Sequence, residues 1–167
     1  MFADNIRPWV QLPKLQLPRV QLLVGIQSHM GLNVEIEKDG LGAVFTYTGI
    51  VNGDDAYRES KALYTPERLK KLKYQIADLR QVSRIEVSPK AIQNLAELDK
   101  NAAKEANGFF IASIVDHDLQ ESLSQFYRAY ANDPFITANI FRSIEPAREW
   151  IEAMLAESNA KVSETIV

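Results

Sequence analysis

The chain has 167 residues, of which 46% are hydrophobic, 25% charged and 9% aromatic, as expected for one globular domain. Lysine and arginine total 19 against 22 aspartates and glutamates, a net charge of −3, so the basic excess typical of nucleic-acid-binding proteins is missing. Cysteine is absent and there are two histidines, His29 and His117. This excludes disulfides, a thiolate nucleophile and a metal centre built on Cys or His, and leaves open only carboxylate sites for hard cations. We expect no cofactor.

No stretch of the sequence approaches the ~18 consecutive apolar residues of a membrane span. The longest apolar run near the start covers residues 22–26. It is shorter than the core of a signal peptide, roughly 7–15 residues, and no small-residue cleavage site follows it. We therefore expect a cytoplasmic protein with no membrane span.

Residues 1–29 differ in character from the rest of the chain. Pro8, Pro13 and Pro18 recur at a constant interval, and each proline disfavours helix at the position before it. The segment is predicted to be an extension outside the fold, or an arm that lies across a sheet face or edge of this molecule or a neighbour. The prolines argue against a helical anchor on a membrane surface. The folded domain is expected at residues 30–157, followed by a polar tail at 158–167 that frays.

The first part of the domain predicts a hairpin followed by helix. Residues 33–37 and 41–48 both alternate apolar and polar side chains and are separated by Asp39-Gly40, a strong signal for an antiparallel hairpin. A helix to about residue 64 follows, with three candidate N-cap residues: Asn52, Asp54 and Asp55. Thr65-Pro66 then opens a short helical turn.

The remainder of the domain alternates strands and helices. The predicted strands cover residues 74–79, 109–115 and 137–141, and the predicted helices begin at Ser88-Pro89, at Asp116 or Asp118, and near Pro146. In the first of these helices the buried stripe is predicted to be Ile92, Leu95, Ala96, Ala102, Ala103 and Ala106, with Glu97, Asp99 and Glu105 solvated. In the second, the predicted buried stripe is Leu119, Leu123, Phe126, Tyr127 and Tyr130.

The resulting order, ββαβαβαβα, predicts an α/β fold with a mainly parallel five-stranded sheet and one antiparallel edge strand. Right-handed crossovers between neighbouring strands would place all helices on one face of this sheet. Residues 109–115 nevertheless have apolar side chains on both sides, which is typical of a strand covered on both faces. The second face must therefore be covered by a displaced helix, the N-terminal segment, a second subunit or an apolar ligand.

Several motifs resemble the STAS fold of sulphate transporters and anti-sigma-factor antagonists. Asp78-Leu79, Val82-Ser83, Glu86 and Ser88 fall where that fold has a strand end, an acidic residue and a helix-opening serine. The chain is also similar to small bacterial STAS/CRAL-TRIO-like proteins of undetermined function. That similarity rests on Gly49-Ile50-Val51, the helical segment 96–99 and the segment from Phe141-Arg142 to Trp150. The resemblance spans about residues 30–155 and implies a STAS-like, non-enzymatic module.

Ser88 is a candidate phosphorylation site. In the antagonist proteins the helix-opening serine is phosphorylated by a partner kinase, which controls docking, and the resemblance carries this role to Ser88. A phosphate at a helix N-terminus would meet free backbone N–H groups. From the residues alone, Ser88 followed by Pro89 is a good N-cap with proline at the first helical position.

Charged residues are expected to gather where the parallel strands end, the edge at which open α/β sheets place ligands. His117 between Asp116 and Asp118 could transfer protons near neutral pH, or could be an ordinary exposed residue beside a helix cap. We define the charged rim as the full set of these candidates for contact with a partner or small ligand: Asp54, Asp78, Arg80, Arg84, Glu86, Asp116, His117 and Arg142.

Three functions remain open from the sequence. The first is a non-enzymatic regulatory module that acts through protein–protein contacts, with a protein partner or as a homodimer. The second is a carrier of a small apolar ligand or lipid, bound between the sheet and a helix layer as in CRAL-TRIO proteins. The third and least favoured is an enzyme that uses the strand-end acids and His117. None of them involves nucleic acid, and we assign no catalytic residue and no metal ligand.

Overall fold

The Asp39-Gly40 turn forms the predicted hairpin. In the computed structural model, which describes residues 30–165, β1 (Met30–Glu37) pairs antiparallel with β2 (Gly42–Asn52). Lys38, Asp39 and Gly40 between them all have positive φ, a conformation that tight strand reversals use and that glycine adopts without strain. The segment 1–29, and with it the predicted extension or arm, lies outside the described residues.

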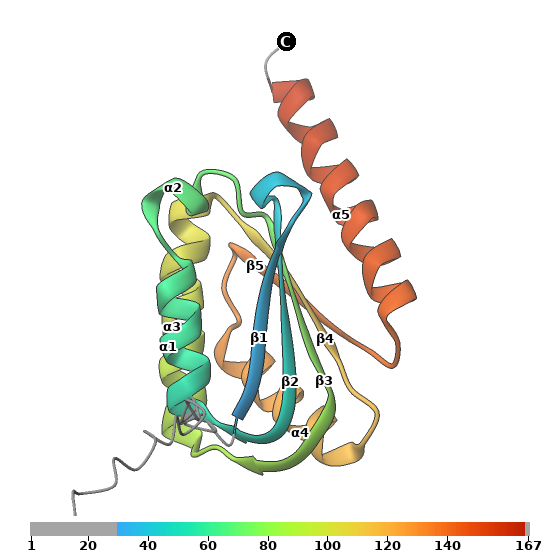
Figure 1. The fold of residues 1–167 in the computed structure, drawn as a ribbon. Coiled ribbons are helices and arrows are strands. Elements are labelled where there is room, and N and C mark those ends of the chain that lie inside the picture. Colours follow the sequence, from blue (N-terminus) through green and yellow to red (C-terminus); the bar gives the residue numbers. More distant parts are fainter. Residues whose placement is uncertain (1–29, 166–167) are drawn as a thin grey trace, which may run out of the picture.

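The later elements follow in the predicted order (Figure 1). They are α1 (Gly53–Leu63), α2 (Pro66–Leu69), β3 (Tyr74–Glu86), α3 (Pro89–Ala106), β4 (Phe109–Ile114), α4 (Asp118–Tyr130), β5 (Ile136–Phe141) and α5 (Ile144–Thr165). The strand order is β1-β2-β3-β4-β5, and β2 to β5 are parallel. The predicted α/β fold with one antiparallel edge strand is confirmed.

Local capping explains where several helices begin and end. The Asn52 side chain accepts hydrogen bonds from the backbone N–H groups of Asp54 and Asp55 and so begins α1. Thr65 caps α2 in the same way, and Asn107 ends α3 in the left-handed conformation. These three boundaries agree with the sequence.

Strand β3 is longer than predicted. It was expected to end at Leu79, but it continues to Glu86 because β2 pairs with it as far as Asn52, through two register shifts near Thr48 and Gly49. Asp78-Leu79 therefore lies in the middle of a strand, and the prediction that it marks a strand end is wrong. Periodicity misses such an extension because residues 80–86 are mostly polar and half-exposed or exposed.

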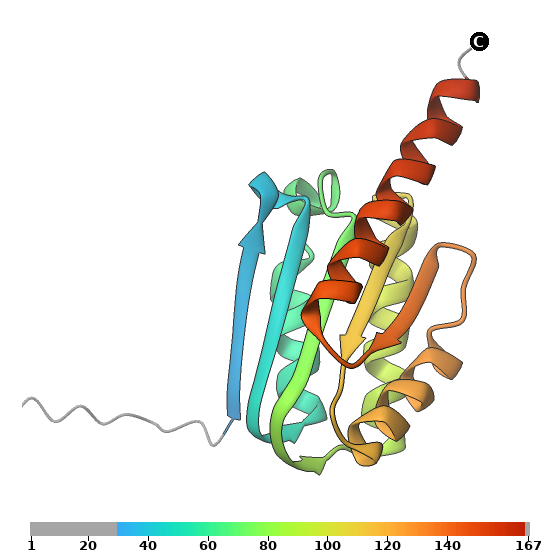
Figure 2. The same cartoon turned by 90° about the vertical axis from the view of Figure 1, so that its right-hand side faces the viewer.

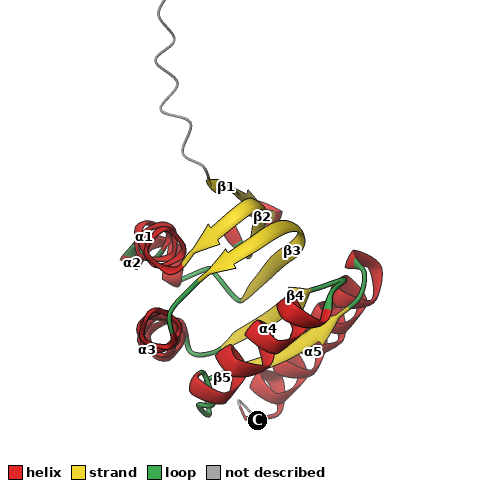
Figure 3. Cartoon of the chain, turned by 90° about the horizontal axis from the view of Figure 1, so that it is seen from below, coloured by secondary structure: helices red, strands yellow, loops and turns green. Residues whose placement is uncertain are grey.

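The second face of the sheet is covered by α5. Helices α1, α3 and α4 pack on one face, as right-handed crossovers predict, whereas α5 crosses the opposite face (Figures 2 and 3). Ala147 and Ile151 of α5 pack against the inner strands at Ile76, Ala112 and Ile114. The sequence analysis offered several possible covers for this face. Among the described residues, the cover is a displaced helix.

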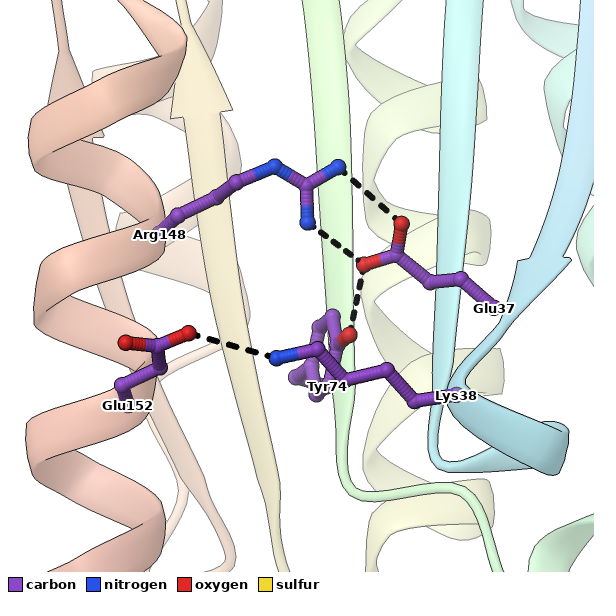
Figure 4. A network of polar contacts seen from close by, with 5 residues as sticks. All are labelled: Glu37, Lys38, Tyr74, Arg148 and Glu152. Carbon is purple, nitrogen blue, oxygen red and sulfur yellow. Dashed lines mark hydrogen bonds and ion pairs between the residues drawn. The ribbon is translucent and has the colours of Figure 1, made fainter.

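A polar network attaches α5 to the end of β1 (Figure 4). The Arg148 guanidinium donates two hydrogen bonds to the Glu37 carboxylate, at 2.8 and 3.0 Å, and the Tyr74 hydroxyl donates a third at 2.5 Å. Lys38 Nζ lies 3.3 Å from Glu152 Oε1. The hydrogen bonds from Arg148 hold the pKa of Glu37 below its usual value, despite the opposing effect of partial burial. The bidentate geometry fixes the helix position over the sheet.

Helix α5 extends past the end of the sheet (Figure 1). It continues to Thr165, through the tail for which the sequence predicts fraying, and the described side chains from Ala156 onward are exposed. Within residues 30–165, no helix has the length and apolar content to cross a bilayer.

Candidate functional site

The charged-rim residues after β4 and β5 form exposed ion pairs. His117 Nε2 lies 3.4 Å from Asp116 Oδ1, and its side chain is 71% exposed. Arg142 pairs with Glu121 of α4. Exposed pairs of this kind contribute only about 0–1 kcal/mol, and neither has the buried surroundings that tune a group for proton transfer.

The start of α4 differs from the prediction that Asp116 or Asp118 caps it. His117 occupies the N-cap position without a side-chain capping bond. The buried side chain of Gln120 reaches back instead, and its Oε1 accepts a hydrogen bond from the Asp116 backbone N–H at 3.0 Å. This bond satisfies the backbone N–H that precedes the N-cap position, and neither Asp116 nor Asp118 is the N-cap residue.

Three further charged-rim residues lie near the ends of β2 and β3. Arg84 and Glu86 are exposed and pair with each other. Asp54 is exposed in the first turn of α1, where a negative charge complements the helix dipole. These contacts are local to the ends of β2 and β3.

Asp78 and Arg80 form the best-defined pair of the charged rim. Asp78 is buried, and Arg80 donates to it from Nε at 2.9 Å and from Nη2 at 2.7 Å. Burial alone would raise the pKa of Asp78, but the hydrogen bonds and charge of Arg80 bring it below its usual value. The charges of Glu145 and Asp116 also act on Arg80. This pair is a satisfied ion pair in the middle of β3.

Ser88 begins α3 as a helix cap. Its Oγ accepts a hydrogen bond from the backbone N–H of Ala91 at 3.1 Å, with Pro89 at the start of the helix. The residue is exposed. The cap predicted from the sequence is present, and phosphorylation of Ser88 stays a prediction.

The Ser88→Ala variant should lose about 1 kcal/mol of unfolding free energy because the backbone N–H of Ala91 loses its partner. Ser88→Asp is the matched variant: aspartate is an equally good cap, so it should keep the wild-type stability. Urea unfolding of both variants measures the difference. Equal stability of Ser88→Ala and wild type would show that the cap contributes nothing.

The predicted buried face of α4 is wrong for two of its residues, Leu119 and Phe126. Leu119 is 63% exposed and Phe126 is 41% exposed, whereas Gln120 and Ser124 are buried. Gln120 can be buried because its amide also donates to the Val82 carbonyl oxygen, at 3.4 Å. Leu123 and Tyr127 of the predicted stripe do face the interior, where they line a cavity with Ser124.

A cavity of about 100 Å³ lies between the sheet and the helices α1, α3 and α4. Its wall is mostly apolar, with a few polar side chains. The residues that line it come from three strands, three helices and the segment before α3: Phe45, Tyr47, Val51, Gly53, Ala56, Ser60, Gln75, Ala77, Leu79, Val87, Ala91, Ile92, Leu95, Asp99, Ile111, Ser113, Leu123, Ser124 and Tyr127. A concave, mostly apolar space with few polar groups is the usual form of a small-molecule site.

A buried carboxylate, that of Asp99, lines this cavity. Asp99 is 4% exposed. Its Oδ1 accepts a hydrogen bond from the Tyr64 hydroxyl at 2.5 Å and its Oδ2 accepts one from the Tyr127 hydroxyl at 2.6 Å. The Gln75 side-chain amide donates in turn to the Tyr64 hydroxyl at 2.6 Å. The prediction that Asp99 is solvated is wrong.

Burial controls the titration of this cluster. Loss of solvent raises the pKa of Asp99 to about 6, although the hydrogen bonds from Tyr127 and Tyr64 act in the opposite direction. Burial also raises the pKa values of Tyr64, Tyr127 and Tyr47, with a further contribution from the charge of Asp99. At neutral pH the tyrosines are therefore protonated donors, and Asp99 is largely ionised.

The helical spacing of α3 contains a signal that could have found Asp99. Ile92, Ala96, Ala103 and Ala106 are all buried, and Asp99 falls between them at the same intervals of three and four residues. An acidic residue in a buried stripe indicates a partner or a ligand. Residue type alone had suggested a solvated position.

Across residues 30–165, no group of three or more His, Asp or Glu side chains is placed to hold a metal ion. Asp99 lies among tyrosine hydroxyls and an amide, which makes a hydrogen-bonding cluster.

The solved structures that are similar to this chain include the following two. One is an uncharacterised protein from the DUF3478 family with a SpoIIAA-like fold, from Shewanella loihica PV-4, at 19% identity and a TM-score of 0.48; the match covers 73% of this chain and 93% of that chain. The other is the anti-sigma factor antagonist SpoIIAA in its unphosphorylated form, at 11% identity and a TM-score of 0.43, covering 73% and 98%. No family model and no curated protein matches the chain. The likeness concerns the fold alone.

Proposed function

We propose that the chain is a non-enzymatic binding module whose cavity takes a small, mainly apolar ligand. The observation that carries this proposal is the cavity of about 100 Å³ between the sheet and helices α1, α3 and α4. Interiors are normally packed with few voids larger than a water molecule. A space of this size, lined by apolar side chains and a few polar ones, is better explained as a binding site for a ligand than as a packing defect.

The size of the cavity sets the class of ligand. A cavity of roughly 150 Å³ accommodates the six non-hydrogen atoms of benzene, so about 100 Å³ suits a molecule of roughly four or five non-hydrogen atoms. A fatty acid or other lipid contains several times as many atoms. The size therefore favours a small organic molecule over the lipid that a carrier of the CRAL-TRIO type would take.

Isobutanol is a suitable probe, with an apolar branch and one hydroxyl. We expect saturable binding of isobutanol to the full chain, measured by titration calorimetry or by ligand-observed NMR. Binding should be lost in Ala77→Leu, in which the larger side chain occupies the cavity from β3, and kept in Ala62→Leu, an exposed position on α1. Equal binding to both variants, or none to the wild type, would contradict the proposal.

A second candidate function is a module that works through protein contacts, including a homodimer. It is favoured by the exposure of Leu119 and Phe126 on α4, because exposed apolar side chains on one helix face are common at interfaces. Ser88 is also exposed at the start of α3, where phosphorylation could change docking. Sedimentation of the full chain tests the homodimer: it should dissociate in Phe126→Ser, and a monomeric wild type would contradict it.

A further inference from the structure

Asp99 has two hydrogen-bond donors but no counter-charge. None of the ion pairs among the described residues includes Asp99. Its two hydrogen-bond partners, Tyr64 and Tyr127, are neutral hydroxyl donors. An ionised carboxylate in a buried, apolar setting is costly unless a cation is paired with it. The site therefore has an unmet requirement for positive charge.

The carboxylate keeps the capacity to accept further hydrogen bonds. Each oxygen of an ionised carboxylate can accept two, and the structure shows one tyrosine hydroxyl on each. Asp99 also belongs to the cavity wall. A donor inside the cavity can therefore reach the carboxylate without displacing either tyrosine.

Ser124 provides a second, independent indication that the cavity is a ligand site. It is 3% exposed and lines the same cavity. Its Oγ is buried and has no hydrogen-bond partner among the described residues. Unsatisfied buried hydroxyls are rare in folded proteins and need an explanation. A ligand with several N–H donors could satisfy Ser124 Oγ as well as Asp99.

The rest of the cavity suits the apolar part of such a ligand. Phe45, Tyr47 and Tyr127 contribute aromatic rings to its wall, and aromatic faces attract cations. Leu79 and Ile111 supply aliphatic surface. The combination of one anionic group, aromatic rings and aliphatic side chains is complementary to a small molecule with a cationic head and a hydrocarbon body.

We propose that the cavity takes a small organic cation of the primary alkylammonium class, with its ammonium group against Asp99 and Ser124 and its alkyl group among the apolar side chains. This inference rests on the proposed function, since it requires the cavity to be a ligand site. It adds the charge of the ligand and the two residues that recognise it. The cavity volume limits the ligand to roughly four or five non-hydrogen atoms.

Three small molecules of similar size and shape but different charge test whether the charge of the ligand determines its binding. Isobutylammonium chloride, isobutanol and sodium isobutyrate share a branched alkyl group and differ in charge. Each is titrated against the full chain at pH 7.5, with sodium chloride as the control for ionic strength. We expect isobutylammonium to bind at least about tenfold more tightly than isobutanol, because the cation forms charge-assisted hydrogen bonds with Asp99. Isobutyrate should not bind.

The Asp99→Asn variant tests the residue, after circular dichroism has shown that it is folded. It should lose the preference for isobutylammonium over isobutanol. The comparison of probes in the wild type needs no variant, so the test stands even if Asp99→Asn does not fold. If isobutanol binds as tightly as isobutylammonium, the inference that the ligand is a cation is wrong, whereas the proposal that the cavity is a ligand site stands. If neither probe binds, the proposed function fails together with this inference.

Discussion

Asp99→Asn should gain stability relative to the wild type as the pH rises. The difference in unfolding free energy between the two proteins should change by about 2 kcal/mol between pH 4.5 and pH 8, in favour of the variant at high pH. This follows from the pKa of Asp99, which burial raises from 3.8 to about 6 in the folded protein. A shift of one pKa unit corresponds to about 1.4 kcal/mol.

The direction of the effect follows from proton binding. The folded state holds the Asp99 proton more tightly than the unfolded state does, so this stabilisation is complete below about pH 4 and is lost as the pH rises through about 6. Glu37 and Asp78 have lowered pKa values, so their contributions are lost only at lower pH. The window from pH 4.5 to 8 therefore isolates Asp99.

Urea unfolding at several pH values measures this difference. Glu97→Gln is the matched control, because it makes the same kind of change at an exposed position of the same helix. If the wild-type and Asp99→Asn profiles run parallel across the window, Asp99 does not have a raised pKa, and its burial in the cavity wall is wrong.

The second large effect is expected at Ile151 of α5. Ile151 is 2% exposed and packs with Ala147 against the inner strands. Ile151→Ala should cost about 2–5 kcal/mol of unfolding free energy, because it removes buried methyl groups and leaves a cavity beneath the helix. The cost should be high because α5 covers the apolar part of the second sheet face.

Glu149→Ala is the control for this prediction. Glu149 is exposed on the same helix, and surface substitutions away from special contacts usually change stability by about 0.5 kcal/mol or less. Thermal or urea unfolding of both variants gives the comparison. If Ile151→Ala costs no more than Glu149→Ala, α5 is not anchored on the sheet as described.

Local signals in the sequence predicted most of the fold. The hairpin follows from two alternating runs around Asp39-Gly40, and the starts of α1, α2 and α3 follow from Asn52, Thr65 and Ser88. These features depend on residues within a few positions of one another. The requirement for a covered second face was also present in the apolar residues of β4, although the identity of the cover was not.

The errors arose where distant contacts decide the structure. Gln120 is buried because Val82, on another element, supplies a carbonyl partner, and its burial leaves Leu119 exposed. Asp99 is buried because Tyr64 and Tyr127 approach it from outside α3. In both cases the partner is too far along the chain for periodicity to reveal, so residue polarity gave the wrong face.

The charged rim also shows that the sequence does not reveal which side chains contact one another in the folded protein. The ends of parallel strands lie at one edge of the sheet, but several of the charged side chains pair with residues close to them in the sequence. Arg80 turns to Asp78 and Arg84 to Glu86 within β3. The cavity, by contrast, gathers residues from three strands and three helices, and an adjacency of that kind is visible only in the folded structure.

Methyl NMR of the full chain with isobutylammonium tests the ligand site most directly. Leu79, Ile92, Ile111 and Leu123 line the cavity, whereas Ile76, Ile114 and Ile151 lie on the α5 side of the sheet. We expect saturable shifts of the first group of methyl signals and unchanged signals from the second. Saturable shifts confined to the α5 side, or no saturable shift in the cavity methyls, would contradict a ligand site between the sheet and helices α1, α3 and α4.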